Sequence, residues 1–273
     1  MNSKENNLKI KWNIKTHNKI ALKYEKMHGE IYNEYEQSRL KNELTRAIAE
    51  IKTSSPIKLV LDYGCGAGNL TQHLSNLGCE VLACDVSKGF LDLVSSKKYP
   101  TKVITKKLNG IDLRDIPDSS VDMIAIYSVL HHIPDYLGIF NEFNRILKTG
   151  GIIYIDHEPS EEFWLKNPDY IEFTGKMKKI TPLNIKKYFI CTNYYDWLVR
   201  KIINPRYHRE GDIHVFEDDH IEWSKIIKYL ISIGGDVILS KSYLLFRRGY
   251  NKSLYEEYKD KITDMHVLIF KKL

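Results

Sequence analysis

The residues most suited to chemistry lie between positions 59 and 70, which read LVLDYGCGAGNL. An apolar run ends at Asp62, three glycines alternate at Gly64, Gly66 and Gly68, and a helical pattern begins directly after them. Glycine lets the backbone approach a ligand closely and adopt positive φ where a turn requires it. The start of the following helix offers free N–H groups. Together these features suit the binding of a small molecule that contains a nucleoside and a carboxylate.

Two familiar nucleotide motifs fit this segment poorly. The dinucleotide pattern G-x-G-x-x-G places its third glycine where this chain has Asn69, and the G-K-[ST] of a phosphate-binding loop is absent. The pattern D-x-G-x-G-x-G instead resembles motif I of class I S-adenosylmethionine (SAM) methyltransferases. That resemblance implies that the glycine loop forms the floor under the methionine part of SAM. The alternative is a glycine-rich turn in an ordinary α/β protein.

Further acidic and polar residues extend the expected cofactor site. Asp85 ends the second predicted strand, where a carboxylate can accept both ribose hydroxyls, although a capping or surface role is the alternative. Asp62 resembles the motif I acid, which implies that it orders the loop and contacts the methionine amino group; a local Asx turn is compatible with this. Asn109 stands where many relatives have an Asp that reads adenine, and its side-chain oxygen can accept from the N6 amine.

The resemblance continues in two later segments. Residues 116–135 are similar to the family's fourth motif, and residues 145–151 are similar to R-x-L-K-P-G-G, with Thr149 in place of proline. Related enzymes fold N-terminal helices over the cofactor, and a tyrosine there often contacts the SAM carboxylate or shields the methyl group. The expected SAM-binding residues are Tyr24, Tyr32, Asp62, Gly64, Cys65, Gly66, Asn69, Asp85, Val86, Leu108, Asn109, Gly110, Tyr127 and Ser128.

Candidate catalytic residues follow the fourth and fifth predicted strands. His131 and His132, with Asp156 across the rim of the sheet, resemble the arrangement in natural-product sugar O-methyltransferases. There a histidine removes the hydroxyl proton and an aspartate orients it, so the base role is assigned to His131 or His132 and the orienting role to Asp156. The alternative is that the histidines pack or cap the next helix.

An acidic and histidine-rich stretch, residues 212–222, raises the question of a divalent metal. If residues 212–216 are extended, side chains alternate between the two faces, and Asp212 and His214 point to the same side. Asp218 and Asp219 are more plainly a helix N-terminal signal. The sequence therefore predicts no metal site.

The elements that position these residues alternate between strands and helices. Strands are expected at 57–61, 80–84, 101–105, 121–127, 152–155, 236–240 and 265–270. Residues 1–15 are expected to be frayed. Pro134 is expected in the first turn of a helix, and Gly150-Gly151 is expected to end that helix. The pattern predicts an α/β fold with a Rossmann-like, seven-stranded, mostly parallel sheet. The expected parts are an N-terminal helical cap (1–55), a SAM-binding core (56–156), an aromatic and basic substrate lid inserted after the fifth strand (157–219), and the rest of the sheet (220–273).

Composition narrows the function classes. The net charge of +6 is modest and scattered, so a nucleic-acid partner is not favoured. Four cysteines without metal spacing, a polar N-terminus and no long apolar segment indicate a cytoplasmic protein away from the membrane. The resemblance is closest to the type 11/12-like, small-molecule branch. It implies methylation of a hydroxyl or amine on a sugar or specialised metabolite, with S-adenosylhomocysteine (SAH) as product, by a monomer or homodimer. An RNA or protein methyltransferase and a non-catalytic SAM-binding protein remain alternatives.

Overall fold

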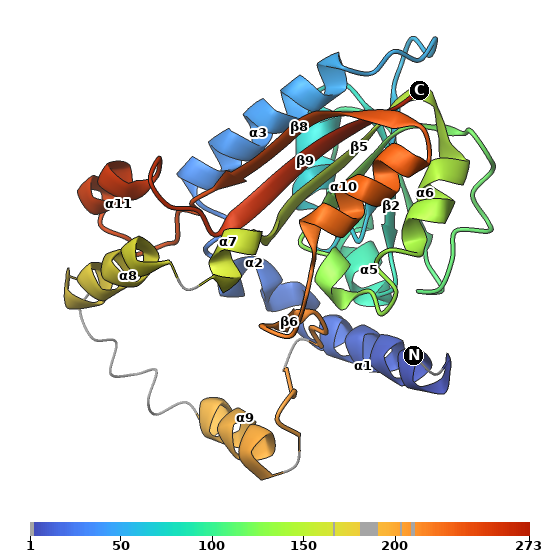
Figure 1. The fold of residues 1–273 in the computed structure, drawn as a ribbon. Helices are drawn as coiled ribbons and strands as arrows, with labels where there is room; N and C mark the ends of the chain where they lie inside the picture. The colour runs from blue at the N-terminus through green and yellow to red at the C-terminus, as the bar shows by residue number, and fades with distance from the viewer. Residues whose placement is uncertain (1–2, 166, 181–190, 203, 209–210) are drawn as a thin grey trace.

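A seven-stranded sheet forms the centre of the computed structural model, which describes residues 3–165, 167–180, 191–202, 204–208 and 211–273. The strand order is β3-β2-β1-β4-β5-β9-β8 (Figure 1). β9 pairs antiparallel with both β5 and β8, whereas the other neighbours pair in parallel. The predicted mostly parallel, Rossmann-like fold is therefore confirmed. The strands are β1 Leu59–Tyr63, β2 Glu80–Asp85, β3 Val103–Lys107, β4 Val121–Tyr127, β5 Leu147–Pro159, β8 Gly235–Tyr243 and β9 Met265–Lys272.

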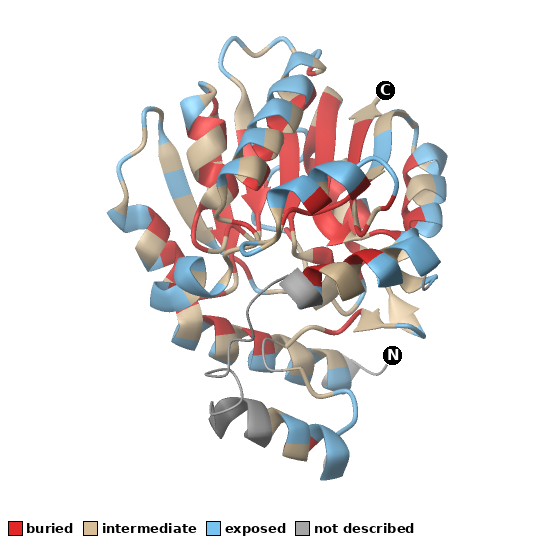
Figure 2. Ribbon diagram, turned by 90° about the vertical axis from the view of Figure 1, so that its left-hand side faces the viewer, coloured by how far each residue is buried: buried red, intermediate tan, exposed pale blue. Residues whose placement is uncertain are grey.

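Helices cover both faces of this sheet. Apolar side chains of α3, α4 and α5 pack on one face, and those of α6 and α10 pack on the other. β4 is buried at every residue, as expected for a central parallel strand. Figure 2 shows the central strands of the sheet as buried and the outer faces of the flanking helices as largely exposed. The helices are α1 Ser3–Ile20, α2 Tyr24–Met27, α3 Glu34–Ala49, α4 Asn69–Asn76, α5 Lys88–Ser96, α6 Ile139–Ile146, α7 Glu161–Trp164, α8 Pro168–Ile180, α9 Cys191–Ile202, α10 Trp223–Ser232 and α11 Lys252–Tyr258, with 3-10 turns at Ala21–Lys23 and Leu130–His132.

The segment between β5 and α10 contains α7, α8 and α9, and a small two-stranded sheet of β6 Val215–Phe216 and β7 Asp219–His220. Residues 181–190 of the predicted lid lie outside the described residues. Within the described part of the chain, no helix has the length and apolarity needed to cross a membrane.

Three local predictions were wrong. Residues 3–15 are not frayed, because they belong to α1, whose side chains pack against the core domain. Pro134 precedes a turn in which Asp135 Oδ1 accepts from the Gly138 backbone N–H, and α6 begins only at Ile139. Gly150 and Gly151 lie inside β5, since Leu147 already pairs with Val121 of β4 and so ends the helix before the glycines.

Candidate functional site

The glycine loop joins β1 to α4 and is fastened to the end of β2. Gly64, Gly66 and Gly68 have φ of 72°, 49° and 86°, a left-handed backbone that favours glycine. The N–H groups of Gly64 and Cys65 both donate to the Cys84 carbonyl, at 2.8 and 2.9 Å. A Cβ on Gly64 would lie 2.6 Å from a Val129 methyl group, so the loop and the β4 end approach each other closely here.

Two buried aspartates flank this loop. Asp85 Oδ2 accepts from the Gly66 N–H at 3.0 Å and its Oδ1 accepts from the Ser87 N–H at 2.7 Å. Asp62 Oδ2 accepts from the Thr71 hydroxyl at 2.5 Å, which ties β1 to α4. Burial raises the pKa of Asp85 to about 6 and that of Asp62 to about 7. Both carboxylates are thus held in position before any ligand arrives.

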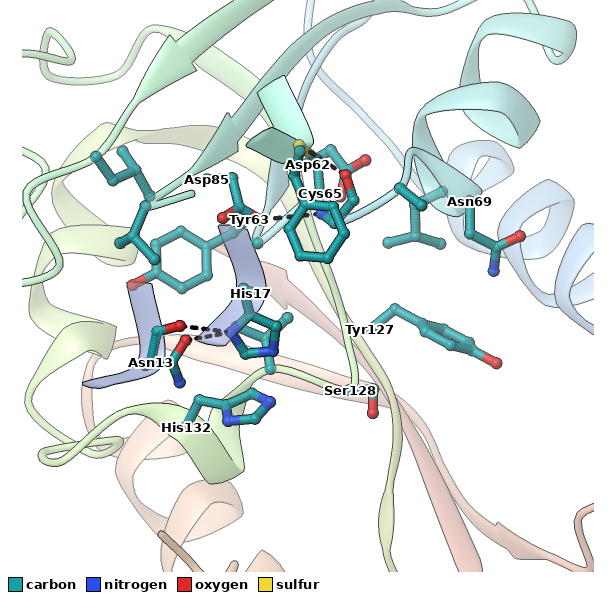
Figure 3. Close-up of a pocket in the computed structure, with 18 of the residues that line it drawn as sticks. Asn13, His17, Asp62, Tyr63, Cys65, Asn69, Asp85, Tyr127, Ser128 and His132 are labelled. Carbon is teal, nitrogen blue, oxygen red and sulfur yellow. Dashed lines mark hydrogen bonds between the residues drawn. The ribbon is translucent and has the colours of Figure 1, made fainter. Parts of the chain in front are cut away.

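These groups line a cavity whose empty volume is about 970 Å³, open solvent at its mouth included. Figure 3 shows the loop residues Asp62, Cys65 and Asn69 and, around the same cavity, His17 and His132. Ile10, Val86 and Leu108 add an apolar wall. Polar groups beside an apolar wall are the mixture that small-ligand pockets commonly show.

The cavity brings together thirteen of the fourteen predicted cofactor residues. Asn109 is the exception: it does not line the cavity. Its side chain accepts from the N–H groups of Ile111 and Asp112 and donates to the Asp112 carboxylate, which makes it part of a local turn. The structure gives Asn109 this local role, and the predicted adenine contact stays a prediction. The predicted cofactor residues that line the cavity are Tyr24, Tyr32, Asp62, Gly64, Cys65, Gly66, Asn69, Asp85, Val86, Leu108, Gly110, Tyr127 and Ser128.

The two candidate bases differ in position. His132 lines the cavity, and burial holds its pKa well below the usual value, so its ring is neutral at pH 7. His131 is not among the lining residues; its Nδ1 donates to Glu158 Oε2 at 2.7 Å. Asp212, from the segment before β6, lies 3.3 Å from His132 Nδ1, measured to its Oδ1.

Asp156 does not orient either histidine, contrary to the prediction. Its carboxylate accepts from Arg39 at 2.8 Å and from the hydroxyls of Tyr154 and Tyr243. Strict alternation would place Asp156 and Glu158 on the same side of β5. The register shifts between them, however, at His157, which has a φ of 61°. This β-bulge re-aims Glu158, which takes the place beside His131 that was expected for Asp156.

Comparison with known proteins identifies this arrangement. Residues 61–155 match the protein family described as "Methyltransferase domain". This segment, about a third of the chain, is similar to a methyltransferase domain. The match covers the glycine loop, Asp85, Tyr127 and the histidine pair, and it ends one residue before Asp156.

Relatives of this methyltransferase domain include curated enzymes. The chain is 34% identical over 95 residues to malonyl-[acyl-carrier protein] O-methyltransferase of Yersinia pestis, covering 35% of this chain and 34% of that protein. It is 27% identical over 190 residues to demethylmenaquinone methyltransferase of Staphylococcus aureus, covering 68% and 75%. The match thus spans about a third of the Yersinia protein and three quarters of the Staphylococcus protein.

Solved structures share the fold. A SAM-dependent methyltransferase from Archaeoglobus fulgidus has a TM-score of 0.52 at 16% identity, with 86% of this chain and 94% of that chain covered. Magnesium protoporphyrin IX methyltransferase from Synechocystis, solved with bound SAH, has a TM-score of 0.52 at 14% identity, with 87% and 83% covered. At these identities the likeness shows the architecture alone.

SAM and SAH are named for the two solved proteins, and several features of this cavity suit such a ligand. The Asn69 side-chain Nδ2 is buried without a hydrogen-bond partner, which suits a donor for the SAM carboxylate. Asp85 retains acceptor capacity for ribose hydroxyls beyond its two backbone bonds. The apolar wall of Ile10, Val86 and Leu108 suits a flat adenine ring.

Sequence reasoning missed the part of the domain's cavity that α1 forms. Ile10, Asn13 and His17 line it, and His17 Nδ1 donates to Asn13 Oδ1 at 2.5 Å. Their i, i+3, i+7 spacing places them on one helix face, a signal hidden by the polar composition of the segment. No described residue of 157–219 lines the cavity.

Proposed function

We propose that this chain is an enzyme that transfers a methyl group from SAM to a hydroxyl or amine of a small molecule. The observation that carries the proposal is that one cavity in a methyltransferase domain joins the glycine loop, Asp85 and a neutral histidine, His132. When bound, SAM supplies an electrophilic methyl group on a sulfonium.

The chain's own residues divide the work of binding. Asp85 accepts from the ribose hydroxyls, Asn69 donates to the methionine carboxylate, and Asp62 keeps the loop and α4 in register through Thr71. Tyr24 and Tyr32 stand on the N-terminal side of the cavity and close it against water. Because these groups are held by the fold, little reorganisation is needed when the cofactor binds.

The acceptor's proton is proposed to leave on the side of the cavity that His132 lines. A hydroxyl is a weak nucleophile until it loses its proton, and His132 is the cavity-lining histidine next to a carboxylate, Asp212. This arrangement favours an oxygen acceptor over an amine. The Yersinia relative is likewise named as an O-methyltransferase.

A sugar or specialised metabolite is the proposed class of acceptor. Ile10, Asn13 and His17 of α1 line one side of the cavity, so the space is partly enclosed rather than a flat face. An enclosed space suits a small acceptor better than a folded RNA or protein. Residues 157–219 are proposed to complete the acceptor side as a lid, and the protein is proposed to work in the cytoplasm as a monomer or homodimer.

The test is a turnover assay with SAM and matched acceptors, namely nucleotide sugars, free sugars, phenols and primary amines. We expect SAH to form in step with a mass gain of one methylene on a hydroxyl compound. SAH formation with total RNA or with a protein substrate but with no small molecule would support the RNA or protein alternative. Tight SAM binding without turnover on any acceptor would support a non-catalytic SAM-binding protein.

A further inference from the structure

Three potential metal ligands meet behind the cavity wall. His131, His132 and Asp212 each place one donor atom so that all three lie within 4.8 Å of one another. Asp212 Oδ1 is 3.3 Å from His132 Nδ1 and 4.0 Å from His131 Nε2. Metal–ligand bonds of about 2.0–2.1 Å at tetrahedral angles put neighbouring donors about 3.4 Å apart. The separations of Asp212 from the two histidines, 3.3 and 4.0 Å, are near that spacing before any ion is bound.

Two of the three donor atoms have unmet hydrogen-bonding capacity. His132 Nδ1 and Asp212 Oδ1 are buried and neither has a hydrogen-bond partner, although they are close enough to each other for an ion pair. Buried polar atoms normally have partners, and unpartnered ones call for an explanation such as an ion. A cation between the two atoms would satisfy both.

The third ligand is oriented by a carboxylate. His131 Nδ1 donates to Glu158 Oε2 at 2.7 Å, and Nε2 is the ring atom on the side of Asp212. Glu158 is itself fixed, because its Oε1 accepts from the N–H groups of Val129 and Leu130 at 2.7 Å each. A carboxylate–histidine pair of this kind is the usual support for a metal-binding imidazole.

The segment that carries Asp212 is fastened to the histidine pair. The N–H groups of Ile213 and His214 both donate to the His131 carbonyl, at 2.9 and 3.1 Å. His214 Nε2 also donates to the Ile133 carbonyl at 3.0 Å. Asp212 is therefore held in place by backbone contacts that do not depend on its own side chain.

From this geometry we propose that His131, His132 and Asp212 bind one divalent transition-metal ion, such as Zn²⁺ or Fe²⁺, beside the SAM cavity. Two imidazoles and one carboxylate suit these ions, whereas Mg²⁺ prefers an all-oxygen set. Three protein ligands leave a coordination position open, and His132 is the ligand that lines the cavity.

The proposed ion would activate the acceptor, an idea that rests on the proposed methyl transfer. An acceptor hydroxyl that coordinates the ion has a lowered pKa and loses its proton to solvent. The oxygen lone pair then forms the bond to the methyl carbon as the C–S bond breaks, with the electron pair going to sulfur. The acceptor class narrows to compounds with a metal-binding oxygen, such as a phenol, an enol or a vicinal diol.

The experiment is zinc binding to chelator-treated full-length protein, with stoichiometry from elemental analysis and affinity from calorimetry. Variants are Asp212→Asn and the matched control Asp218→Asn, an exposed acid a few residues along the same segment. We expect one Zn²⁺ per chain in the wild type and in Asp218→Asn, at least tenfold weaker binding in Asp212→Asn, and no displacement by equimolar Mg²⁺. Equal zinc binding by wild type and Asp212→Asn, or no stoichiometric zinc in the wild type, would overturn the site.

SAM binding in the same samples separates this proposal from the one on which it rests. SAM binding and full turnover in the chelator-treated protein would reject the metal and leave the methyltransferase intact. Stoichiometric zinc binding by a protein that binds no SAM would support the metal site and reject the proposed methyl transfer. Turnover lost with the chelator and restored by Zn²⁺, at unchanged SAM affinity, supports both.

Discussion

Adding one methyl group at Gly64 tests whether the close approach of the glycine loop to the β4 end shapes this site. In Gly64→Ala the new Cβ would lie 2.6 and 2.8 Å from the two Val129 methyl carbons, distances at which an atom must move. The left-handed φ of 72° costs about 1–2 kcal/mol for alanine, and the overlap adds about 1–3 kcal/mol. We expect the free energy of unfolding to fall by roughly 2–5 kcal/mol.

Gly66→Ala is the matched control, because its φ of 49° is also left-handed but its nearest neighbour beyond the adjacent residues is 4.0 Å away. Backbone strain alone predicts a loss of about 1–2 kcal/mol there. At about 2–3 °C per kcal/mol for a chain of this size, Gly64→Ala should melt roughly 4–15 °C below wild type and Gly66→Ala roughly 2–6 °C below. Adding Val129→Ala should recover part of the Gly64→Ala loss. Equal losses in the two single variants would refute the argument from the Val129 contact.

Two further predictions concern buried charges. Arg39→Met removes the cation that bridges Glu36 and Asp156, so we expect the free energy of unfolding to fall by about 3–5 kcal/mol in denaturant titrations. Lys41→Met, at an exposed position on the same helix, is the control. A loss below about 1 kcal/mol in Arg39→Met would show that the two acids do not need the arginine. SAM affinity should fall as the pH drops through about 6, because Asp85, whose folded pKa is raised to about 6, is the stronger ribose acceptor when ionised. Calorimetry at pH 5 and 8 checks this: the decrease should be smaller in Asp85→Asn, although Asp62, with a pKa of about 7, still titrates there.

The fold could be predicted from the sequence because its signals are local and repeated. Buried parallel strands appear as short apolar runs, and alternation with helices dictates a layered sheet. The predicted ends of helices and strands were wrong where strand pairing outweighed the local signal of glycine and proline. The glycines after Leu147 look like a helix end, yet the strand pairing of Leu147 with Val121 had already ended the helix.

Most residues that line the cavity could be predicted for the same reason, since the loop, Asp62 and Asp85 lie at the ends of consecutive strands. The cluster of His131, His132 and Asp212 could not. The β-bulge at His157 places Glu158, rather than Asp156, beside His131. Backbone hydrogen bonds from Ile213 and His214 to the His131 carbonyl bring Asp212 close to histidines about 80 positions earlier in the chain. Neither a single-residue bulge nor a contact between such distant positions produces a periodic pattern that one sequence can reveal. The helix face of Ile10, Asn13 and His17 did leave a trace, hidden by polar neighbours.

The most direct test of the central claim is calorimetric binding of SAM and SAH to wild type, Asp85→Ala and the control Asp92→Asn, an exposed acid on α5. Micromolar affinity in the wild type and in Asp92→Asn is expected, with a loss of about ten- to hundredfold in Asp85→Ala, as hydrogen bonds to a charged group worth about 1.5–3 kcal/mol imply. Thermal unfolding of each variant checks that it is folded. Failure of the folded wild type to bind either compound, or undiminished binding by Asp85→Ala, would contradict the account.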